Sequence, residues 1–231
     1  TLLAGDGMLV KRPILVTEDA VLVDCGYPGC SAALEEALTQ AGVRPEQLTK
    51  LLLTHQDDDH MGAAFELVQK YPQIRVAASR TEQPYLTGEK KNLRLAQAEQ
   101  LQERLPEEQK AFGLQFCQQL RAVRPVKVDL EVEEGDWFPW AGGCRVLATP
   151  GHTPGHISLY LEQEQVLITG DAAVAEGGRL ELANPQFCLD LEQAERSLER
   201  LRGMPCARYI CYHGGVLEKG GRSLSVVDSA V

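Results

Sequence analysis

Histidines and aspartates concentrate in a few short loops of this sequence, and the densest cluster is THQDDDH at residues 54–60. Two histidines flank three consecutive aspartates there, directly behind a run of three leucines. Neutral imidazole and carboxylate are usual protein ligands for zinc, iron and manganese. Loops at strand ends are also where a rigid scaffold presents chemistry. The loop is therefore either a metal site or a polar turn that happens to be acidic.

The other histidines favour the metal. All five lie at expected strand ends beside glycine, proline or aspartate, and they share their setting with one carboxylate in LITGDAA; the set is His55, His60, His152, His156, His213 and Asp171. A lone histidine is more often a surface or core residue than a ligand. Six ligand-type side chains in equivalent places indicate one shared site.

Strands and helices that would position these loops alternate along the chain. Short β-branched or apolar runs predict strands at 14–16, 20–23, 50–53, 74–78, 126–132, 136–138, 144–148, 156–161, 166–169 and 207–211. Helices are expected up to Gly42, at 62–70 and at 191–202, where Asp190 caps the start and Gly203 ends the helix. The alternation predicts an α/β fold with two sheets packed face to face and helices outside.

Residues 81–122 differ from the rest, because they are rich in Gln, Glu, Lys and Leu with helical periodicity. They predict a helical insertion, which is either a lid or substrate wall or a helical pair that only adds to the core. Candidate substrate-facing side chains are Tyr85, Lys90, Lys91, Arg94 and Phe112, although a basic cluster such as theirs more often forms a solvated helix face.

Composition narrows the class of protein. The 231 residues are expected to form a single domain spanning 1–231, and the net charge of −10 argues against a nucleic-acid partner. No apolar run approaches the length of a membrane helix, and no signal segment is visible. Seven scattered cysteines without a CxxC pair suggest reduced thiols, hence a cytoplasmic location. The oligomeric state is left open, with a homodimer as one option.

Four spaced motifs together resemble the metallo-β-lactamase-fold hydrolase superfamily. They are HxxxDH at 55–60, TPGHTPGH at 149–156, Gly170–Asp171 and His213–Gly214, and Asp24 and Gly26 also match the family's early strand–DxG turn. The motifs occur in the family's order and span residues of about 20 to 215. The resemblance implies a four-layer αββα sandwich, which agrees with the layers expected above.

The resemblance also implies a centre of two divalent metal ions. His55, Asp57 and His152 would hold the first ion, and Asp171 would bridge to a second; the second ion's other ligands would be Asp59, His60 and His213. His156 and Asp24 would support the site from behind. Asp59 would orient the attacking water and pass on its proton, so Asp59 and Asp171 are the expected catalytic carboxylates.

Asp57 stands where the family pattern HxHxDH has a histidine. If Asp57 is a ligand, the extra carboxylate favours iron or manganese over zinc. If its side chain is too short to reach, the first site is incomplete and one ion binds tightly. We expect the first arrangement, with the neighbouring Asp58 facing solvent or capping the following helix.

For function, the resemblance implies a small-molecule hydrolase in which a metal-bridging hydroxide attacks an ester, thioester or lactone. Val174 replaces the tyrosine that lactonases of this fold carry, and no C-terminal glutathione-binding region of the glyoxalase II kind is evident. The alternative is an oxidoreductase resembling persulfide dioxygenases, with one iron on His55, His152 and Asp171. A non-catalytic binder is disfavoured by the complete ligand set.

Overall fold

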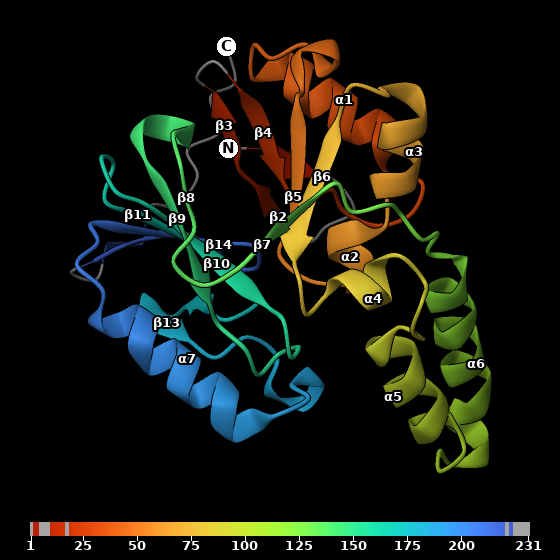
Figure 1. Cartoon of the computed structure of the whole chain (residues 1–231). Helices are drawn as coiled ribbons and strands as arrows, with labels where there is room; N and C mark the ends of the chain where they lie inside the picture. The colour runs from red at the N-terminus through yellow and green to blue at the C-terminus, as the bar shows by residue number, and fades with distance from the viewer. Residues whose placement is uncertain (1, 5–9, 17–18, 220–221, 224–231) are drawn as a thin grey trace. The chain divides into compact units, whose positions relative to one another are not determined.

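The computed structural model describes residues 2–4, 10–16, 19–219 and 222–223. Two compact units divide the chain, one formed by Asp19–Val132 and the other by the segments before and after it. Each unit carries one of the larger sheets (Figure 1). The expectation of a single domain over 1–231 stays a prediction, since its ends lie outside the described residues.

Parallel strands form the sheet of the Asp19–Val132 unit. They follow one another in chain order, as β4 (Ala20–Val23), β5 (Lys50–Leu53), β6 (Arg75–Ser79) and β7 (Leu130–Val132). The apolar runs of β4, β5 and β6 are almost wholly buried, as is usual for strands of a parallel sheet. The predicted bounds of β4 and β5 are confirmed, and β6 is shifted by one residue.

One predicted strand is much shorter than expected. The run 126–132 forms a strand only over β7, and the backbone N–H of its first residue, Val126, bonds outside the neighbouring strand β6. Val126 N–H donates to the carbonyl of Leu86, and Asp129 N–H donates to the carbonyl of Val76. The apolar pattern of this stretch therefore reflects burial and not regular pairing.

Helices α1 (Ser31–Gln40) and α3 (Ala64–Lys70) lie side by side along the parallel sheet (Figure 1). Two polar contacts join them, from Ser31 Oγ to Glu66 at 2.6 Å and from Lys70 Nζ to Glu35 at 2.7 Å. The short helices of this unit are η1 (Pro45–Gln47), α2 (Asp58–Met61) and α4 (Gln83–Leu86).

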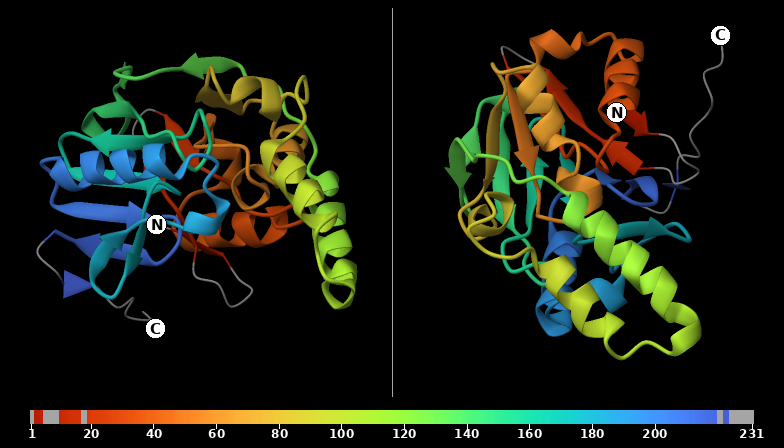
Figure 2. Two further views of the ribbon diagram at one scale, coloured as in Figure 1. Left: turned by 90° about the horizontal axis from the view of Figure 1, so that it is seen from below. Right: turned by 90° about the vertical axis from the view of Figure 1, so that its right-hand side faces the viewer.

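The helical segment expected at 81–122 is present. After α4 it consists mainly of α5 (Leu93–Gln102) and α6 (Glu107–Ala122), which pack together side by side (Figure 2). Ala98, Cys117 and Leu120 form the small core between them. Asn92 caps α5 by accepting a hydrogen bond from Leu95 N–H, as a good N-cap residue does.

The other unit holds a mixed sheet of seven described strands. Among these, only β11 and β14 pair in parallel, and the order is β16 (Arg222–Ser223), β15 (Gly215–Glu218), β14 (Arg208–Cys211), β11 (Val166–Gly170), β10 (Ile157–Leu161), β9 (Cys144–Ala148) and β8 (Trp137–Phe138). Smaller elements are β1 (Leu2–Ala4), β2 (Val10–Arg12), β3 (Ile14–Val16), β12 (Val174–Glu176), β13 (Arg179–Glu181), η2 (Trp140–Gly142) and η3 (Pro185–Phe187).

Helix α7 (Leu191–Gly203) covers this mixed sheet. Its Leu198 and Leu201 are buried in one core cluster with Leu147 of β9 and Leu167 of β11. The predicted cap is confirmed, because Asp190 accepts a hydrogen bond from Gln193 N–H. Sheets flanked by helices in both units agree with the expected α/β class. Among the described residues, no helix combines the length and apolar character needed to cross a membrane.

Candidate metal centre

The loop of residues 54–57 connects β5 directly to α2 and carries the first group of expected ligands. His55 and Asp57 lie in the loop, and Asp57 has the extended backbone of a residue that precedes a helix. Asp59 and His60 lie in α2, so the two pairs stand on either side of the helix start. The buried apolar strand β5, which precedes the loop, fixes the position of the backbone that carries these four side chains.

Asp24 and Thr54 fix the two imidazoles of this loop. Asp24 Oδ2 accepts hydrogen bonds from Thr54 Oγ1 and His60 Nδ1, both at 2.8 Å. Because the single Thr54 hydroxyl proton goes to this carboxylate, Thr54 Oγ1 must accept from His55 Nδ1, which lies 3.0 Å away. Both histidines therefore carry their proton on Nδ1 and present Nε2, the arrangement that typically orients metal-binding imidazoles.

Asp24 achieves this in a left-handed backbone conformation, with φ of 57°. Asp is one of the few residues with a side chain that visit this region readily. Its Oδ1 also accepts a hydrogen bond from Thr54 N–H at 2.8 Å, so the turn after β4 is tied to the metal loop. The sequence pattern singled out Asp24, but it missed Thr54, for which the only signal is adjacency to His55.

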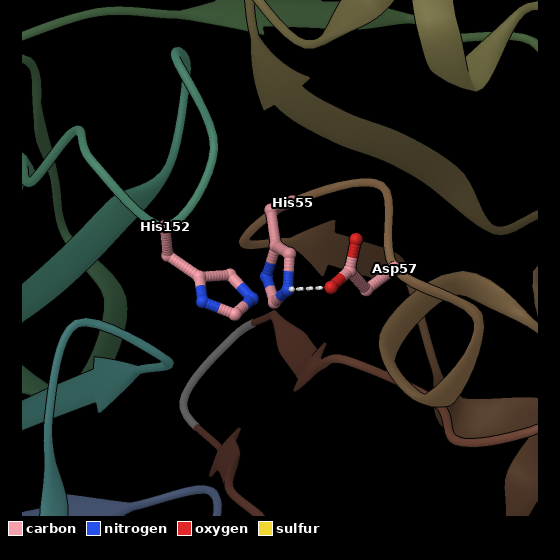
Figure 3. Close-up of side chains that lie close together, drawn as sticks. All are labelled: His55, Asp57 and His152. Atoms are coloured by element: carbon pink, nitrogen blue, oxygen red, sulfur yellow. Dashed lines mark ion pairs between the residues drawn. The ribbon is translucent and has the colours of Figure 1, made fainter. Parts of the chain in front are cut away.

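Each presented nitrogen faces a carboxylate at a distance that suits a shared cation. His55 Nε2 lies 3.7 Å from Asp57 Oδ2, a pair that Figure 3 marks with a dashed line, and His60 Nε2 lies 3.7 Å from Asp59 Oδ2. These separations are too long for hydrogen bonds. Two ligands about 2.1 Å from one tetrahedral ion are separated by about 3.4 Å. The donor types and spacings of the loop therefore fit a divalent metal.

Asp57 has a second partner that the sequence did not indicate. Arg94 of α5 donates to Asp57 Oδ2 from both Nε (2.9 Å) and Nη2 (2.6 Å). Both side chains are buried, with 5% and 8% of their surface exposed. Arg94, named above among the candidate substrate-facing side chains, thus pairs its guanidinium with a carboxylate of the metal loop. Phe112, from the same assignment, is 74% exposed on α6.

Asp58 also departs from expectation. It is the first residue of α2 and is half-buried, so it neither faces solvent fully nor occupies the cap position, which belongs to Asp57. Burial, followed by the charges of Asp59 and Asp57, raises the pKa of Asp58 to about 7. Burial and the two neighbouring carboxylates thus favour the protonated form of Asp58.

The other unit supplies the second group of expected ligands around Asp171, which directly follows β11. Asp171 lies between two histidines and turns a different carboxylate oxygen toward each. His152 Nε2 is 3.6 Å from Oδ2, and His213 Nε2 is 3.5 Å from Oδ1. A carboxylate placed in this way can hold two cations, one through each oxygen.

His156 orders the backbone of Asp171 through a chain of directed hydrogen bonds. Ser158 donates to the Thr169 carbonyl at 3.0 Å, so its oxygen accepts from Thr149 at 2.8 Å. Thr149 in turn accepts from His156 Nδ1 at 2.9 Å, which leaves Nε2 to accept from Asp171 N–H at 2.9 Å. Both ring nitrogens of His156 are engaged, so this histidine positions a ligand and is not one itself.

Gly151, in the TPGH turn beside His152, cannot carry a side chain. Its φ is 132°, and an added Cβ would lie 2.2 Å from the backbone nitrogen of Ala194 in α7. Its carbonyl also accepts from Leu189 and Asp190 N–H groups. Close approach of the turn to α7 therefore fixes the backbone that carries His152.

Replacing Gly151 by Ala is expected to lower the free energy of unfolding by about 2–4 kcal/mol, because α7 must move or the turn must distort. Urea denaturation followed by circular dichroism measures this loss. Gly203→Ala is the matched control, since an added Cβ there meets nothing within 4 Å. Equal stability of both variants would contradict the close approach.

Known proteins resemble this chain in sequence. The family model of the metallo-beta-lactamase superfamily matches residues 8–213. The probable metallo-hydrolase YflN of Bacillus subtilis is 29% identical over 205 residues, covering 84% of this chain and 75% of YflN. A hydroxyacylglutathione hydrolase of Synechococcus is 28% identical over 200 residues, covering 85% of this chain and 59% of that protein. The chain thus spans about three-fifths of that hydrolase.

Solved structures agree in fold. The metallo-beta-lactamase family protein TTHA1429 of Thermus thermophilus superposes with a TM-score of 0.70 at 24% identity, covering 94% of this chain and 73% of that one. TTHA1623, solved in a di-iron-bound form, superposes with a TM-score of 0.65 at 23% identity over 94% of each chain. The fold class expected from the sequence is confirmed.

Proposed function

Because the chain belongs to the metallo-β-lactamase superfamily of metal-dependent hydrolases, we propose that it hydrolyses a small ester, thioester or lactone at a centre of two divalent metal ions. YflN, a probable metallo-hydrolase, and the hydroxyacylglutathione hydrolases support hydrolysis. The name of these hydrolases gives hydroxyacylglutathione, a thioester, as their substrate. A thioester of a small acid is therefore the first compound to test.

The observation that carries this proposal is the placement of Asp171 between His152 and His213, with one oxygen toward each. We assign Asp171 as the bridging ligand. His55, Asp57 and His152 would complete the shell of one ion; the other ion would take Asp59, His60 and His213. The matching nitrogen–oxygen spacings within the 54–60 loop support the same assignment.

When bound, two such ions lower the pKa of a water and stabilise negative charge on the substrate oxygen. The protein's own residues supply orientation and proton transfer. Asp24 keeps His60 in the tautomer that presents Nε2, and His156 holds the backbone of Asp171. The Asp59 carboxylate, which is partly exposed, can take a proton and return it to the leaving group.

The test combines metal analysis with chelation. Protein purified without added metal is analysed for zinc, iron and manganese, and then assayed on an acyl-glutathione thioester, an aryl ester, a lactone and a phosphodiester. Dialysis against a chelator is expected to reduce turnover of the preferred acyl compound below about 1%. Restoring one of the three metals should restore turnover. Full activity in metal-free protein would refute the proposal.

One observation favours a second candidate, the oxidoreductase with a single iron. Arg94 engages Asp57, and the three residues that the resemblance gives to mononuclear iron, His55, His152 and Asp171, do not include Asp57. Oxygen consumption with glutathione persulfide, at one iron per chain, would select this function. Hydrolysis without oxygen uptake, at two metals per chain, would exclude it.

A further inference from the structure

The segment that precedes and opens α5 is attached to the metal loop by several buried or half-buried contacts. Glu82 accepts hydrogen bonds from Gln56 N–H and Gln56 Nε2, both at 3.1 Å. Asn92 Nδ2 donates to the Gln56 carbonyl at 2.8 Å, and Leu93 N–H donates to Gln56 Oε1 at 2.7 Å. Three residues thus hydrogen-bond to Gln56, and Arg94 follows the last of them in sequence at the start of α5.

This attachment places the Arg94 guanidinium beside a single carboxylate oxygen of the loop. Both of its hydrogen bonds to Asp57 end on Oδ2, the same oxygen that faces His55 Nε2 at 3.7 Å. A cation held by His55 and this oxygen would therefore share the oxygen with a guanidinium. Charge-assisted bonds from arginine draw electron density from a carboxylate oxygen, and two positive charges at one oxygen repel each other.

The two histidines of the loop are also supported by different groups. Behind His60 stands a carboxylate, because Asp24 accepts the hydrogen bond from its Nδ1. Behind His55 stands the neutral hydroxyl of Thr54. A carboxylate behind a histidine raises the basicity of the nitrogen that it presents. His60 is thus the stronger imidazole ligand, and the two halves of the loop are electrostatically unequal.

We infer that Arg94 is a positioning residue that weakens metal binding at His55 and Asp57, so that the two ions load unequally. The ion at Asp59 and His60 binds first and tightly. The ion at His55 and Asp57 binds second and at least about tenfold more weakly, because it must compete with the guanidinium. This inference rests on the proposed two-metal function and adds an order of occupancy to it.

Zinc titration of the metal-free protein, followed by calorimetry and by competition with a chromophoric chelator, tests the order. The wild type should show two steps separated by about tenfold or more in affinity. In Arg94→Met the weak step should tighten by about tenfold or more, while the tight step stays within about threefold. If the methionine variant does not fold, Arg94→Gln takes its place, because it keeps a hydrogen-bond donor for Asp57. It should tighten the same step.

Two further variants isolate the cause. Arg121→Met is the matched control, because Arg121 lies in the same helical segment and pairs with Glu99 of α5; its titration should match that of the wild type. In the Asp57→Asn background, Arg94→Met should no longer shift either step. The metal-free Arg94→Met protein should also melt earlier than the wild type and gain more thermal stability from zinc.

Unchanged steps in both Arg94 variants, or a weaker second step, would overturn the inference. Two equal steps in the wild type would also overturn it while leaving the two-metal function intact. A wild-type protein that takes up no zinc, iron or manganese would instead refute the proposed function itself. The two failures are therefore distinguishable in one series of titrations.

Discussion

Replacing Asp171 by Asn is expected to lower turnover of the preferred acyl substrate by about 10³-fold or more and to leave the metal centre largely empty. The loss corresponds to about 4 kcal/mol of transition-state stabilisation, within the several kcal/mol that metal ions supply. An amide keeps the shape of the side chain but offers a single neutral oxygen. It therefore cannot offer a metal-binding oxygen next to His152 and another next to His213 at the same time.

The structure separates this effect from misfolding. The bond from His156 is made to the backbone N–H of Asp171, so the substitution leaves it in place. Metal content and kcat are measured together with the thermal melting curve of the metal-free protein. Asp190→Asn is the control, because asparagine caps a helix as well as aspartate does. An Asp171→Asn enzyme with full metal content and activity would remove the bridging assignment.

Asp24→Ala should cause the largest loss of stability among the site variants, about 3–5 kcal/mol. The substitution leaves three buried donors without their acceptor, namely Thr54 N–H, the Thr54 hydroxyl and His60 Nδ1. It also places alanine at a positive φ, which aspartate tolerates better. Since His60 loses its orienting carboxylate, metal affinity should fall by about 10–100-fold.

Urea denaturation of the metal-free protein and zinc titration measure these two losses separately. Asp19→Ala offers a matched comparison in the same unit, because Asp19 makes partly exposed contacts, a hydrogen bond from Thr49 Oγ1 and an ion pair with Lys50 that is expected to contribute less than about 1 kcal/mol. If Asp24→Ala were no less stable than Asp19→Ala, the buried network would not hold the metal loop.

Local sequence patterns predicted the strands well where an apolar run also pairs with a neighbouring strand along its whole length. The bounds of β4, β5 and β9 agree with the predicted ones, because each is a largely apolar run bounded by polar residues or glycine. The prediction failed at 126–132, where burial without ladder pairing produces the same alternation. Hydrophobicity reports whether a residue is buried, and it does not report where its backbone N–H group points.

The candidate site shows a similar division. The ligand-type residues stand out because histidine and aspartate gather in short loops, and so does His156. Arg94 was not recognised as a partner of Asp57, since 37 positions separate the two and no periodic pattern links them. Thr54, Thr149 and Ser158 act through hydroxyl groups whose direction depends on neighbours that only the fold assembles.

The pairing of Arg94 with Asp57 has a consequence for how the protein is made. A chain with a net charge of −10 and three adjacent aspartates in one loop would resist closing that loop before a cation arrives. Arg94 provides an internal positive charge for the most deeply buried of the three carboxylates. We therefore expect the Asp19–Val132 unit to be able to fold before metal binds.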